Sequence, residues 1–487
     1  MPRPFSRACF LWGEPITVPR SATRADLEAK RMELESALNR LGDEADQAVA
    51  DPEHRRDLLG RILFGLYNIL LLAAAPVVLA ILFGKKRCRS GLVQRMGWLP
   101  HGLAEECRDG QTIWVHAVSM GEATAVVPLV KALKRRYPQD RIFVSTVTET
   151  GRETVLRRLG EEARHVYFPL DFSFSVRRAL DTVRPRAFIC VETELWPNFL
   201  RAVAARGIPA VLVNGRLSTD SFQGYLRLAP FFRRVLSAFS LCSMQTDRDV
   251  ERIVRLGADP RRVARTGNLK FDQIVVDAAS SITSRRAELG IRPHEDIFLA
   301  GSTHPGEEDA VLACYARVLK ACPGLVLIIA PRHIERADEV MASAKAHGLA
   351  VFLRTALGGH QPSEGPRVIV LDTRGELASL YPESTVVFVG GSLVPVGGHS
   401  PLEPAACGKT VVFGPHMDHF AEVAEGLVSL GGGRQIANAD ELPAVMTALL
   451  EDRSRLETMG KAAREFVRAN QGAVARTEAL IAQVLQG

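Results

Sequence analysis

The sequence predicts an α/β protein with two doubly wound domains, preceded by a membrane-anchor helix. Two observations carry this prediction: residues 62–83 form an uncharged apolar stretch, and two series of alternating strand and helix patterns follow it. Such alternation indicates parallel sheets with helices on both faces. The chain has 487 residues, 47% of them apolar, which is enough for two cores of this kind.

Composition narrows the possible functions. A net charge of +6 without long Lys/Arg blocks argues against a nucleic-acid partner and suits anionic substrates or an anionic membrane surface. The eight cysteines are scattered and include no Cys-x-x-Cys pair. We therefore expect reduced thiols in a cytosolic compartment, with neither a disulfide framework nor a zinc site.

Residues 1–57 are polar and helix-prone, and we expect them to form a helical extension. Leu27, Leu34, Leu38 and Leu41 recur at heptad-like spacing, which favours a short amphipathic or coiled-coil helix. The start of the chain lacks the apolar core and cleavage site of an ordinary signal peptide.

Residues 58–85 are predicted to be the anchor. A helix over residues 62–83 would be about 33 Å long at about 1.5 Å per residue, and a bilayer core is about 30 Å thick. The basic residues at 85–89 predict that the following domain is cytoplasmic. Two alternatives stay open: a buried core helix, and partial insertion of a helix that is kinked at Pro76.

The first α/β domain is predicted over residues 86–274 and the second over residues 294–487, with a polar linker at 275–293. In two Rossmann-like domains of this kind, ligands bind at the carboxyl ends of the strands. In the first domain we expect strands at residues 113–117, 142–147, 187–191, 210–213 and 241–244, and helices at 124–133, 151–158, 199–206 and 249–256. In the second domain we expect strands at residues 297–300, 326–329, 368–371, 386–389 and 411–413.

The stretch 386–415 is the most informative part of the second domain. An apolar strand leads into glycine pairs at 390–391 and 397–398, and Ser400 and Pro401 are expected to begin a helix as its N-cap and first residue. Glycine pairs let a ligand approach the backbone, and a helix N-terminus attracts phosphate. The alternative is an ordinary strand–helix–strand connection with glycine caps.

The segment GGSLVPVGGHSPLEP, followed by Gly-Pro-His, resembles the nucleotide-binding motif of the 3-deoxy-D-manno-octulosonic acid (Kdo) transferases of lipopolysaccharide synthesis. These are inverting glycosyltransferases with a GT-B-type fold, in which two Rossmann-like domains face each other across a crevice. The resemblance implies nucleotide contacts at Ser400, Pro401, Leu402 and Glu403. The family commonly has asparagine where this chain has Ser400, whose hydroxyl reaches less far.

Ser119-Met120-Gly121-Glu122 follows the first expected strand, where doubly wound domains place ligands. A carboxylate there can take the proton of a sugar hydroxyl; the alternative is a glutamate that only stabilises a helix N-terminus, by about 0.3–1 kcal/mol. The helix N-terminus should lower the pKa of Glu122, so burial must offset this effect in a base. The resemblance makes Glu122 the general base, with Ser119 and Gly121 beside it.

Glu192 and Glu194 follow the expected strand at 187–191, within the run Glu-Thr-Glu-Leu-Trp-Pro, which resembles a second family motif. One of these carboxylates is expected to orient the acceptor or the reacting sugar. The alternative is a polar turn that ends at Pro197.

Basic residues mark three further turns. Arg216 lies in Asn-Gly-Arg, Lys270 in Gly-Asn-Leu-Lys, and Arg332 in Ala-Pro-Arg-His. Such cations suit the phosphate and carboxylate of a donor, although a single arginine is more often part of a surface ion pair. We assign Arg216 and Lys270 to the donor sugar or phosphate, and the resemblance assigns Pro331 and Arg332 to the nucleotide.

Two more turns match family elements. Asp-Thr-Arg-Gly-Glu-Leu resembles the element whose backbone receives the pyrimidine, which implies nucleotide contacts at Arg374, Gly375 and Glu376. Gly-Ser-Thr-His-Pro-Gly-Glu-Glu has small residues and N–H groups able to hold an anion, and it contributes Ser302 to the donor site. The alternative for both is a capped turn with acidic residues at a helix start.

The resemblance extends from about residue 62 to the C-terminus. It implies transfer of Kdo from CMP-Kdo to the lipid A precursor, by an enzyme anchored in the inner membrane with its domains in the cytoplasm. Neither a cofactor nor a metal is expected, because cationic side chains and helix N-termini can neutralise the phosphate of CMP. Two alternatives remain: a GT-B-type sugar-nucleotide epimerase, which needs no lipid acceptor, and a membrane-tethered nucleotide-sugar binding protein.

Overall fold

The chain divides into two compact units in the computed structural model. The first unit comprises Met1–Thr266 and Ala475–Gly487, and the second comprises Gly267–Val474. The basic residues at 85–89 and residues 275–284 of the predicted linker fall outside the described part of the chain. The structure describes residues 13–50, 52–84, 91–100, 102–108, 111–273, 285–357 and 365–486.

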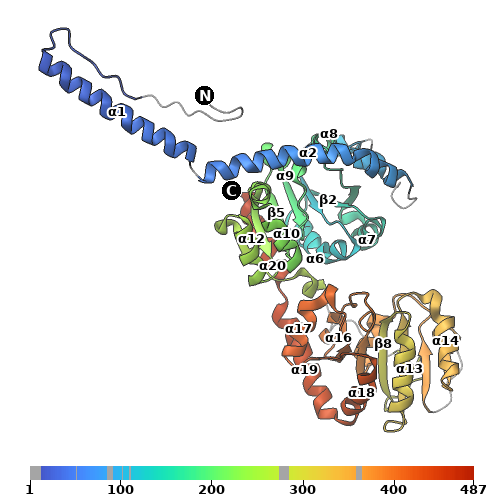
Figure 1. The fold of residues 1–487 in the computed structure, drawn as a ribbon. Coiled ribbons are helices and arrows are strands. Elements are labelled where there is room, and N and C mark those ends of the chain that lie inside the picture. Colours follow the sequence, from blue (N-terminus) through green and yellow to red (C-terminus); the bar gives the residue numbers. More distant parts are fainter. Residues whose placement is uncertain are drawn as a thin grey trace. The chain divides into compact units, whose positions relative to one another are not determined.

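The first unit contains a seven-stranded parallel sheet in the order β3-β2-β1-β4-β5-β6-β7 (Figure 1). Strands β2 and β3 follow one another on one side of β1, and β4 pairs with the other side of β1. The order therefore reverses between β1 and β4, and doubly wound folds bind ligands at such a switch point. The strands are β1 (Thr112–His116), β2 (Arg141–Thr146), β3 (Arg164–Tyr167), β4 (Ala187–Val191), β5 (Ala210–Gly215), β6 (Phe239–Met244) and β7 (Val263–Arg265).

Helices follow the strands and cover this sheet. Strands β1 and β4 are buried along their whole length, as expected for parallel strands between two helical layers. The ring of Trp114 on β1 meets Phe199 edge to face at 5.2 Å, which joins the sheet to the helix after β4. The main helices are α6 (Met120–Arg136), α7 (Glu149–Leu159), α8 (Ser173–Val183), α9 (Pro197–Ala205), α10 (Thr219–Leu226), α11 (Ala229–Leu236) and α12 (Asp247–Leu256).

The second unit repeats this plan with the order β10-β11-β9-β8-β12-β13-β14, again parallel throughout. Its switch point lies between β8 and β12. The strands are β8 (Asp296–Thr303), β9 (Leu325–Pro331), β10 (Val351–Leu353), β11 (Arg367–Val370), β12 (Val386–Val389), β13 (Thr410–Phe413) and β14 (Gly433–Gln435). The helices are α13 (Glu307–Val318), α14 (Ala337–Ala346), α15 (Leu377–Leu380), α16 (Leu402–Ala406), α17 (Ala421–Ser429), α18 (Leu442–Glu451) and α19 (Arg453–Asn470).

The ten strands that the sequence predicts are present, and the two sheets contain four more. The additional strands are β3, β7, β10 and β14, which are the outermost strands of the two sheets. Each has three or four residues, and three of the four contain charged or polar side chains that are half-buried or exposed. Short edge strands of this kind lack the continuous apolar run that identifies a buried parallel strand.

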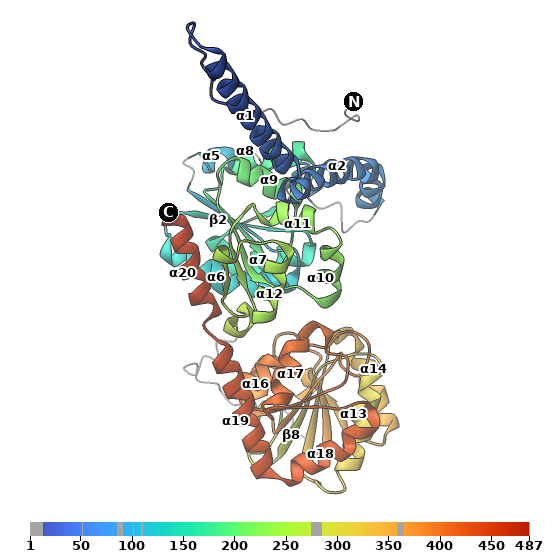
Figure 2. The same cartoon turned by 60° about the vertical axis from the view of Figure 1, so that its left-hand side comes forward.

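The last helix differs from the prediction that the second domain extends to residue 487. Helix α20 (Ala473–Gln486) belongs almost entirely to the first unit (Figure 2). Arg476 Nε donates to the carbonyl of Thr266 at 2.8 Å, and Arg136, at the end of α6, forms a 3.5 Å ion pair with Glu478. Ile481 is fully buried, so the apolar face of α20 completes the core of the first unit.

Two long helices precede the first sheet. In α1 (Arg24–Ala50), Leu27, Leu34 and Leu38 of the heptad-like pattern are about half exposed, at 50%, 48% and 59%. Helix α2 (Pro52–Gly84) contains the predicted anchor. Its stretch Leu58–Val77, with a mean hydropathy of 1.9, is long and apolar enough to cross a membrane, and only 11% of it is buried.

Helix α2 docks on the first unit through one face. The ring of Phe64 is buried and packs against Phe231 of α11 at 6.1 Å. Tyr67 Oη donates to Asp171 at 2.8 Å, and Asn198 Nδ2 donates to Asn68 Oδ1 at 2.8 Å. The predicted anchor is therefore also part of the domain structure. The face turned to solvent carries exposed Ile62, Leu66, Ile69, Leu70, Leu72 and Val77.

Candidate active site

The turn between β1 and α6 places Glu122 at the switch point of the first sheet. Ser119 caps α6: its Oγ accepts the N–H of Glu122 at 3.4 Å and donates to Oε1 of the same residue at 2.9 Å. The other carboxylate oxygen of Glu122 accepts the N–H of Val118 at 2.7 Å. Two hydrogen bonds thus fix the Glu122 carboxylate, and its side chain is 8% exposed.

Burial raises the pKa of Glu122 to about 7, and the carboxylate of Glu192 contributes to this rise. Hydrogen bonds from Val118 and Ser119 act in the opposite direction, and Glu194 adds a smaller upward effect. Burial and neighbouring negative charge therefore outweigh the influence of the helix N-terminus. A carboxylate whose pKa lies near neutrality is well matched to take a proton from a hydroxyl at physiological pH.

The turn after β4 brings two more carboxylates to the same edge of the sheet. Glu192 has a left-handed backbone with φ of +56°, which costs a non-glycine residue about 1–3 kcal/mol and is frequent at functional sites. Its N–H is held by the carbonyl of Val213 at 2.8 Å. Burial raises the pKa of Glu194, with a further contribution from Glu192. Glu122, Glu192 and Glu194 therefore form one electrostatically coupled group.

Arg216 lies beside this group, in the turn that follows β5. Its N–H donates to Oγ1 of Thr193 at 3.1 Å, and the hydroxyl of Thr193 donates back to the carbonyl of Arg216. Because Thr193 stands between Glu192 and Glu194 in the sequence, these bonds tie the Arg216 turn to the carboxylates. The structure thus joins the turn that contains Arg216 to the turn that contains Glu192 and Glu194.

In the second unit, Glu307 organises the glycine-rich loop after β12. Its fully buried carboxylate accepts the N–H groups of Gly391, Ser392 and Leu393 at 2.7–2.9 Å, and that of His304 at 2.9 Å. We expected the loop at residues 301–308 to have N–H groups able to hold an anion. For the N–H of His304 that expectation is wrong, because the carboxylate of Glu307 already accepts it.

The glycines of this loop also make room for protein groups. A Cβ at residue 390 would lie 2.4 Å from the carbonyl oxygen of Ser302. At residue 391, where φ is +67°, a Cβ would lie 3.1 Å from the ring of His399. At residue 397 it would lie 2.7 Å from the ring of His419. Close internal packing therefore explains why glycine occupies these three positions.

The helix after this loop begins one residue later than predicted. Helix α16 has five residues, and Pro401 rather than Ser400 occupies the N-cap, with φ of −84°. Ser400 Oγ accepts the N–H of Leu402 at 3.4 Å, so it still supports the helix start. Glu403 lies in the first turn and is exposed. So short a helix contributes little dipole, which leaves the side chains as the main polar groups at this position.

The turn after β9 carries the predicted Pro331 and Arg332. The N–H of Arg332 donates to the carbonyl of Thr303 at 2.9 Å, which joins the ends of β8 and β9, and the side chain is exposed. Ser302 adopts a left-handed backbone with φ of +59° next to this junction. Lys270 lies elsewhere in the second unit, with its ammonium 5.8 Å from the ring centre of Phe420.

The charged side chains of the turn that follows β11 pair within the protein. Arg374 forms a 2.7 Å ion pair with Glu335, and both side chains are largely exposed. Glu376 accepts hydrogen bonds from Arg285 at 3.0 Å and from Arg354 at 3.1 Å. Its carboxylate is therefore structural. The predicted contact with a base is therefore left to the backbone of the turn, where Gly375 has φ of +87°.

Sequence reasoning missed two histidines at the second switch point. His304 follows β8, His399 ends the loop after β12, and their Nε2 atoms lie 2.8 Å apart. His333 packs edge-on against His304 at 6.1 Å. A single histidine in a loop gives no periodic pattern that predicts a role for it. The one available signal is that both residues lie within family-like motifs. Among the described residues, no group of three or more His, Cys, Asp or Glu side chains could hold a metal ion.

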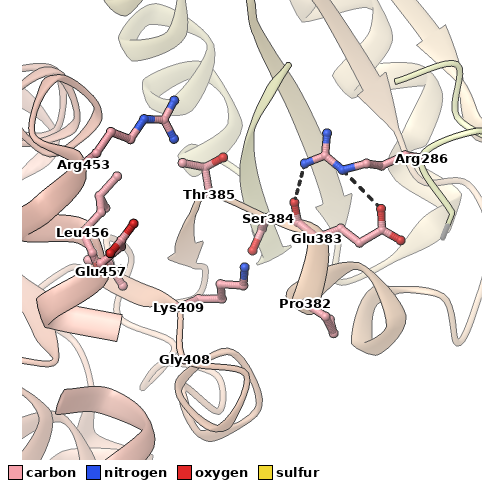
Figure 3. A pocket seen from close by; sticks show the side chains of 11 residues that line it. Arg286, Pro382, Glu383, Ser384, Thr385, Gly408, Lys409, Arg453, Leu456 and Glu457 are labelled. Atoms are coloured by element: carbon pink, nitrogen blue, oxygen red, sulfur yellow. Dashed lines mark hydrogen bonds and ion pairs between the residues drawn. The ribbon is translucent and has the colours of Figure 1, made fainter. Parts of the chain in front are cut away.

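A separate cavity of about 550 Å³ lies at the opposite edge of the second sheet. Thr385 and Lys409, which line it, directly precede β12 and β13, so the cavity faces the amino ends of these strands. Arg286 in its wall forms a 3.4 Å ion pair with Glu383. Figure 3 shows this pair among the residues that line the cavity. The cavity is therefore separate from the switch point, and none of the predicted site residues lines it.

Two doubly wound sheets, with carboxylates at one switch point and basic groups at the other, define a protein of the GT-B class. A family profile described as 3-deoxy-D-manno-octulosonic-acid transferase (kdotransferase) matches residues 90–273. The chain is 35% identical to the 3-deoxy-D-manno-octulosonic acid transferase of Haemophilus influenzae, over 86% of this chain and 98% of that protein. It is 32% identical to the Bordetella pertussis transferase, over 85% and 97%. The chain belongs to the Kdo transferase family of glycosyltransferases.

Comparison of structures supports the fold. The UDP-GlcNAc 2-epimerase of Neisseria meningitidis matches with a TM-score of 0.53 and 13% identity, over 76% of this chain and 99% of that one. A glycosyltransferase from Rickettsia africae matches with a TM-score of 0.52 and 12% identity, over 77% and 98%. At such low identity the likeness extends to the fold alone. The sequence relatives therefore decide between transferase and epimerase, in favour of the transferase.

We predict that Glu307→Ala lowers the free energy of unfolding by at least about 3 kcal/mol. The substitution leaves several buried N–H groups without a partner, and each costs about 1–3 kcal/mol. Urea denaturation followed by circular dichroism measures the change. Glu339→Ala is the control, because its side chain is 67% exposed and its ion pair with Arg336 should contribute less than about 1 kcal/mol. Equal stability of the two variants would contradict the structural role of Glu307.

We predict that Glu122→Gln stabilises the protein at pH 8. The pKa of Glu122 rises from 4.5 to about 7 on folding, so the folded state retains a proton between these values and stability falls as pH rises through them. Glutamine does not ionise, so the variant should gain roughly 2–4 kcal/mol over the wild type at pH 8. The difference should shrink toward pH 4.5. Denaturation midpoints at several pH values test this, with the exposed Glu153→Gln as control; a gain that is independent of pH would refute it.

Proposed function

We propose that the enzyme transfers Kdo from CMP-Kdo to the lipid A precursor, lipid IVA, with inversion of the anomeric centre. Membership of the Kdo transferase family supports the sugar that is moved. The observation that carries the mechanism is the Glu122 carboxylate, which is buried at a switch point and has a pKa of about 7. Inversion follows from a single displacement, which needs one base and no covalent enzyme intermediate.

In this mechanism Glu122 takes the proton from the attacking sugar hydroxyl of the acceptor. The hydroxyl oxygen forms a bond to the anomeric carbon of Kdo, and the bond from that carbon to the phosphate oxygen breaks, with its electron pair leaving on CMP. Glu192 and Glu194 keep the pKa of Glu122 raised and orient the acceptor, while Arg216 offers a charge to the donor sugar. In the second unit, Arg332, Lys270 and the turn containing Gly375 serve the nucleotide and its phosphate.

The direct test is incubation of the purified full-length protein with CMP-Kdo and tetraacylated lipid A precursor. Mass spectrometry of the lipid should show addition of Kdo, and the number of residues added follows from the same spectrum. Release of free Kdo without a modified lipid would contradict the proposed acceptor. Binding of CMP-Kdo without any turnover would instead support the alternative of a tethered binding protein.

Glu122→Gln should reduce turnover by about 10²–10⁴-fold while CMP binding stays unchanged, because it keeps the shape of the side chain but removes its basicity. The rate of the wild type should rise with pH through an apparent pKa near 7, since the base acts in its deprotonated form. The exposed Glu153→Gln is a control for the charge change and should keep both the rate and the profile. Near-normal turnover of Glu122→Gln would transfer the role of base to Glu192 or Glu194.

The proposed function also includes attachment of the enzyme to a membrane. Helix α2 attaches the enzyme to the cytoplasmic face of the inner membrane, where its lipid acceptor lies. Its exposed apolar face supports this role, as does the candidate span Leu58–Val77. The polar contacts of Tyr67 and Asn68 with the domain hold the opposite face of the helix against protein. We therefore expect the contacts of α2 to hold the domain close to the membrane surface.

The double substitution Ile69→Lys and Leu72→Lys should release the enzyme from membranes and leave CMP binding intact. Both side chains are 64% exposed, so the charges disturb the lipid contact rather than the core. Sedimentation with membranes at high salt measures the effect, because salt screens a purely electrostatic attachment. The matched control is Leu34→Lys and Leu38→Lys on α1, where the side chains are 48% and 59% exposed. Unchanged sedimentation of the α2 variant would place the anchor elsewhere.

A further inference from the structure

Two imidazoles bridge the switch point of the second sheet. The Nε2 atoms of His304 and His399 lie 2.8 Å apart. Their ring planes differ by 11° and the ring centres are 5.1 Å apart, so the rings meet end to end in nearly one plane instead of stacking face to face. This is the geometry of one hydrogen bond in which one nitrogen donates and the other accepts. The pair therefore shares a single proton at its centre.

The surroundings of this pair are basic. Arg332, His333 and His419 are the groups beyond His304 that act most strongly on His399. Two carboxylates face His304, and both have internal partners. Glu307 is held by four backbone N–H groups, and Glu308 forms a 2.7 Å ion pair with Arg336. With both carboxylates held by internal partners, Arg332 and the histidines remain as the basic groups that can contact an external anion.

Protonation of the pair depends on such an anion. Burial lowers the pKa of His399 to about 4, and its basic neighbours contribute to this effect. Burial also lowers the pKa of His304, although Glu307 and Glu308 act in the opposite direction. Without an anion beside them, His304 and His399 are therefore both neutral at pH 7. An anion within about 4–6 Å favours the charged form, and because the two rings share one hydrogen bond, the pair gains one proton rather than two.

We propose that His304 and His399 act as one unit that binds an anionic group of the donor, either the phosphate or the sugar carboxylate, and that one proton enters the site with it. The proton comes from solvent, the pair gains one positive charge, and no covalent bond forms. This inference rests on the proposed function, because it names the side chains of the second unit that hold the donor anion. Arg332 provides the permanent charge beside the pair, and the pair provides a charge that appears only when the anion is bound.

Isothermal titration calorimetry with the full-length protein tests the proposal. The probes are CMP, the methyl phosphodiester of cytidine 5′-phosphate, and Kdo. The diester carries one fixed charge, whereas CMP has a phosphate pKa of about 6, so a proton taken up with the diester must reside on the protein. Heats measured in two buffers of different ionisation enthalpy should show uptake of roughly half to one proton at pH 7.5. The affinity should then fall roughly three- to tenfold per pH unit between pH 7.5 and 8.5.

Uptake with the diester assigns the phosphate to the pair, and uptake with Kdo alone assigns the carboxylate. His304→Gln and His399→Gln should each abolish the uptake and flatten the pH dependence of the affinity. His347→Gln is the matched control, because His347 is exposed at the C-terminal end of α14, where its Nδ1 lies 3.0 Å from the carbonyl oxygen of Ser343. Proton uptake that survives in both folded pair variants would overturn the inference.

A measurement on the wild type keeps the test independent of the variants. The histidine side-chain resonances in NMR spectra should show one imidazolium forming when the diester or Kdo is added at pH 7.5. Normal CMP binding with neither proton uptake nor an imidazolium signal would overturn this inference and leave the proposed function intact. Failure of the wild type to bind CMP at all would overturn both.

Discussion

The buried carboxylate of Glu307 is the interaction on which the ligand-facing edge of the second unit depends. It lies at the start of α13, just after β8, and three of its hydrogen bonds reach the loop that follows the neighbouring strand β12. The backbone of a loop at a switch point has no adjacent strand to pair with, so its buried N–H groups need another partner. One internal anion supplies that partner and fixes the loop in a single conformation before any ligand is present.

The position of the histidine pair follows from this constraint. Once Gly391 is held by Glu307, its carbonyl accepts the N–H of Gly398 at 2.8 Å, and Gly390 accepts that of His399 at 3.1 Å. These bonds fold the end of the loop back over its beginning. His399 then meets His304, which stands three residues before Glu307. The segment 304–307 therefore contacts the loop twice. Glu307 binds the beginning of the loop, and His304 contacts His399 at its end, so these contacts form without a ligand.

Sequence reasoning succeeded where the signal is local. The ten interior strands contain continuous apolar runs because both of their faces are buried, whereas three of the four edge strands contain charged or polar residues and the fourth, β10, has only three residues. The location of Glu122 follows from its strand and turn, but its pKa depends on burial and on Glu192, seventy residues later in the sequence. Contacts between distant segments also decide the role of Glu307 and the pairing of His304 with His399. No spacing rule reveals such contacts.

The two units show how the number of hydrogen-bond donors affects a buried carboxylate. Each has a Gly-Glu pair at the start of the helix after its first strand: Gly121-Glu122 in the first turn of α6, and Gly306-Glu307 at the N-cap and first residue of α13. Glu307 accepts four backbone N–H groups, which occupy both of its oxygens. Glu122 accepts one N–H and one hydroxyl, and it faces two other carboxylates. With fewer donors and more negative charge nearby, Glu122 keeps a pKa near neutrality and can exchange a proton with a substrate. The position in the helix differs as well, because Glu307 is the first residue of α13 and Glu122 is the third residue of α6.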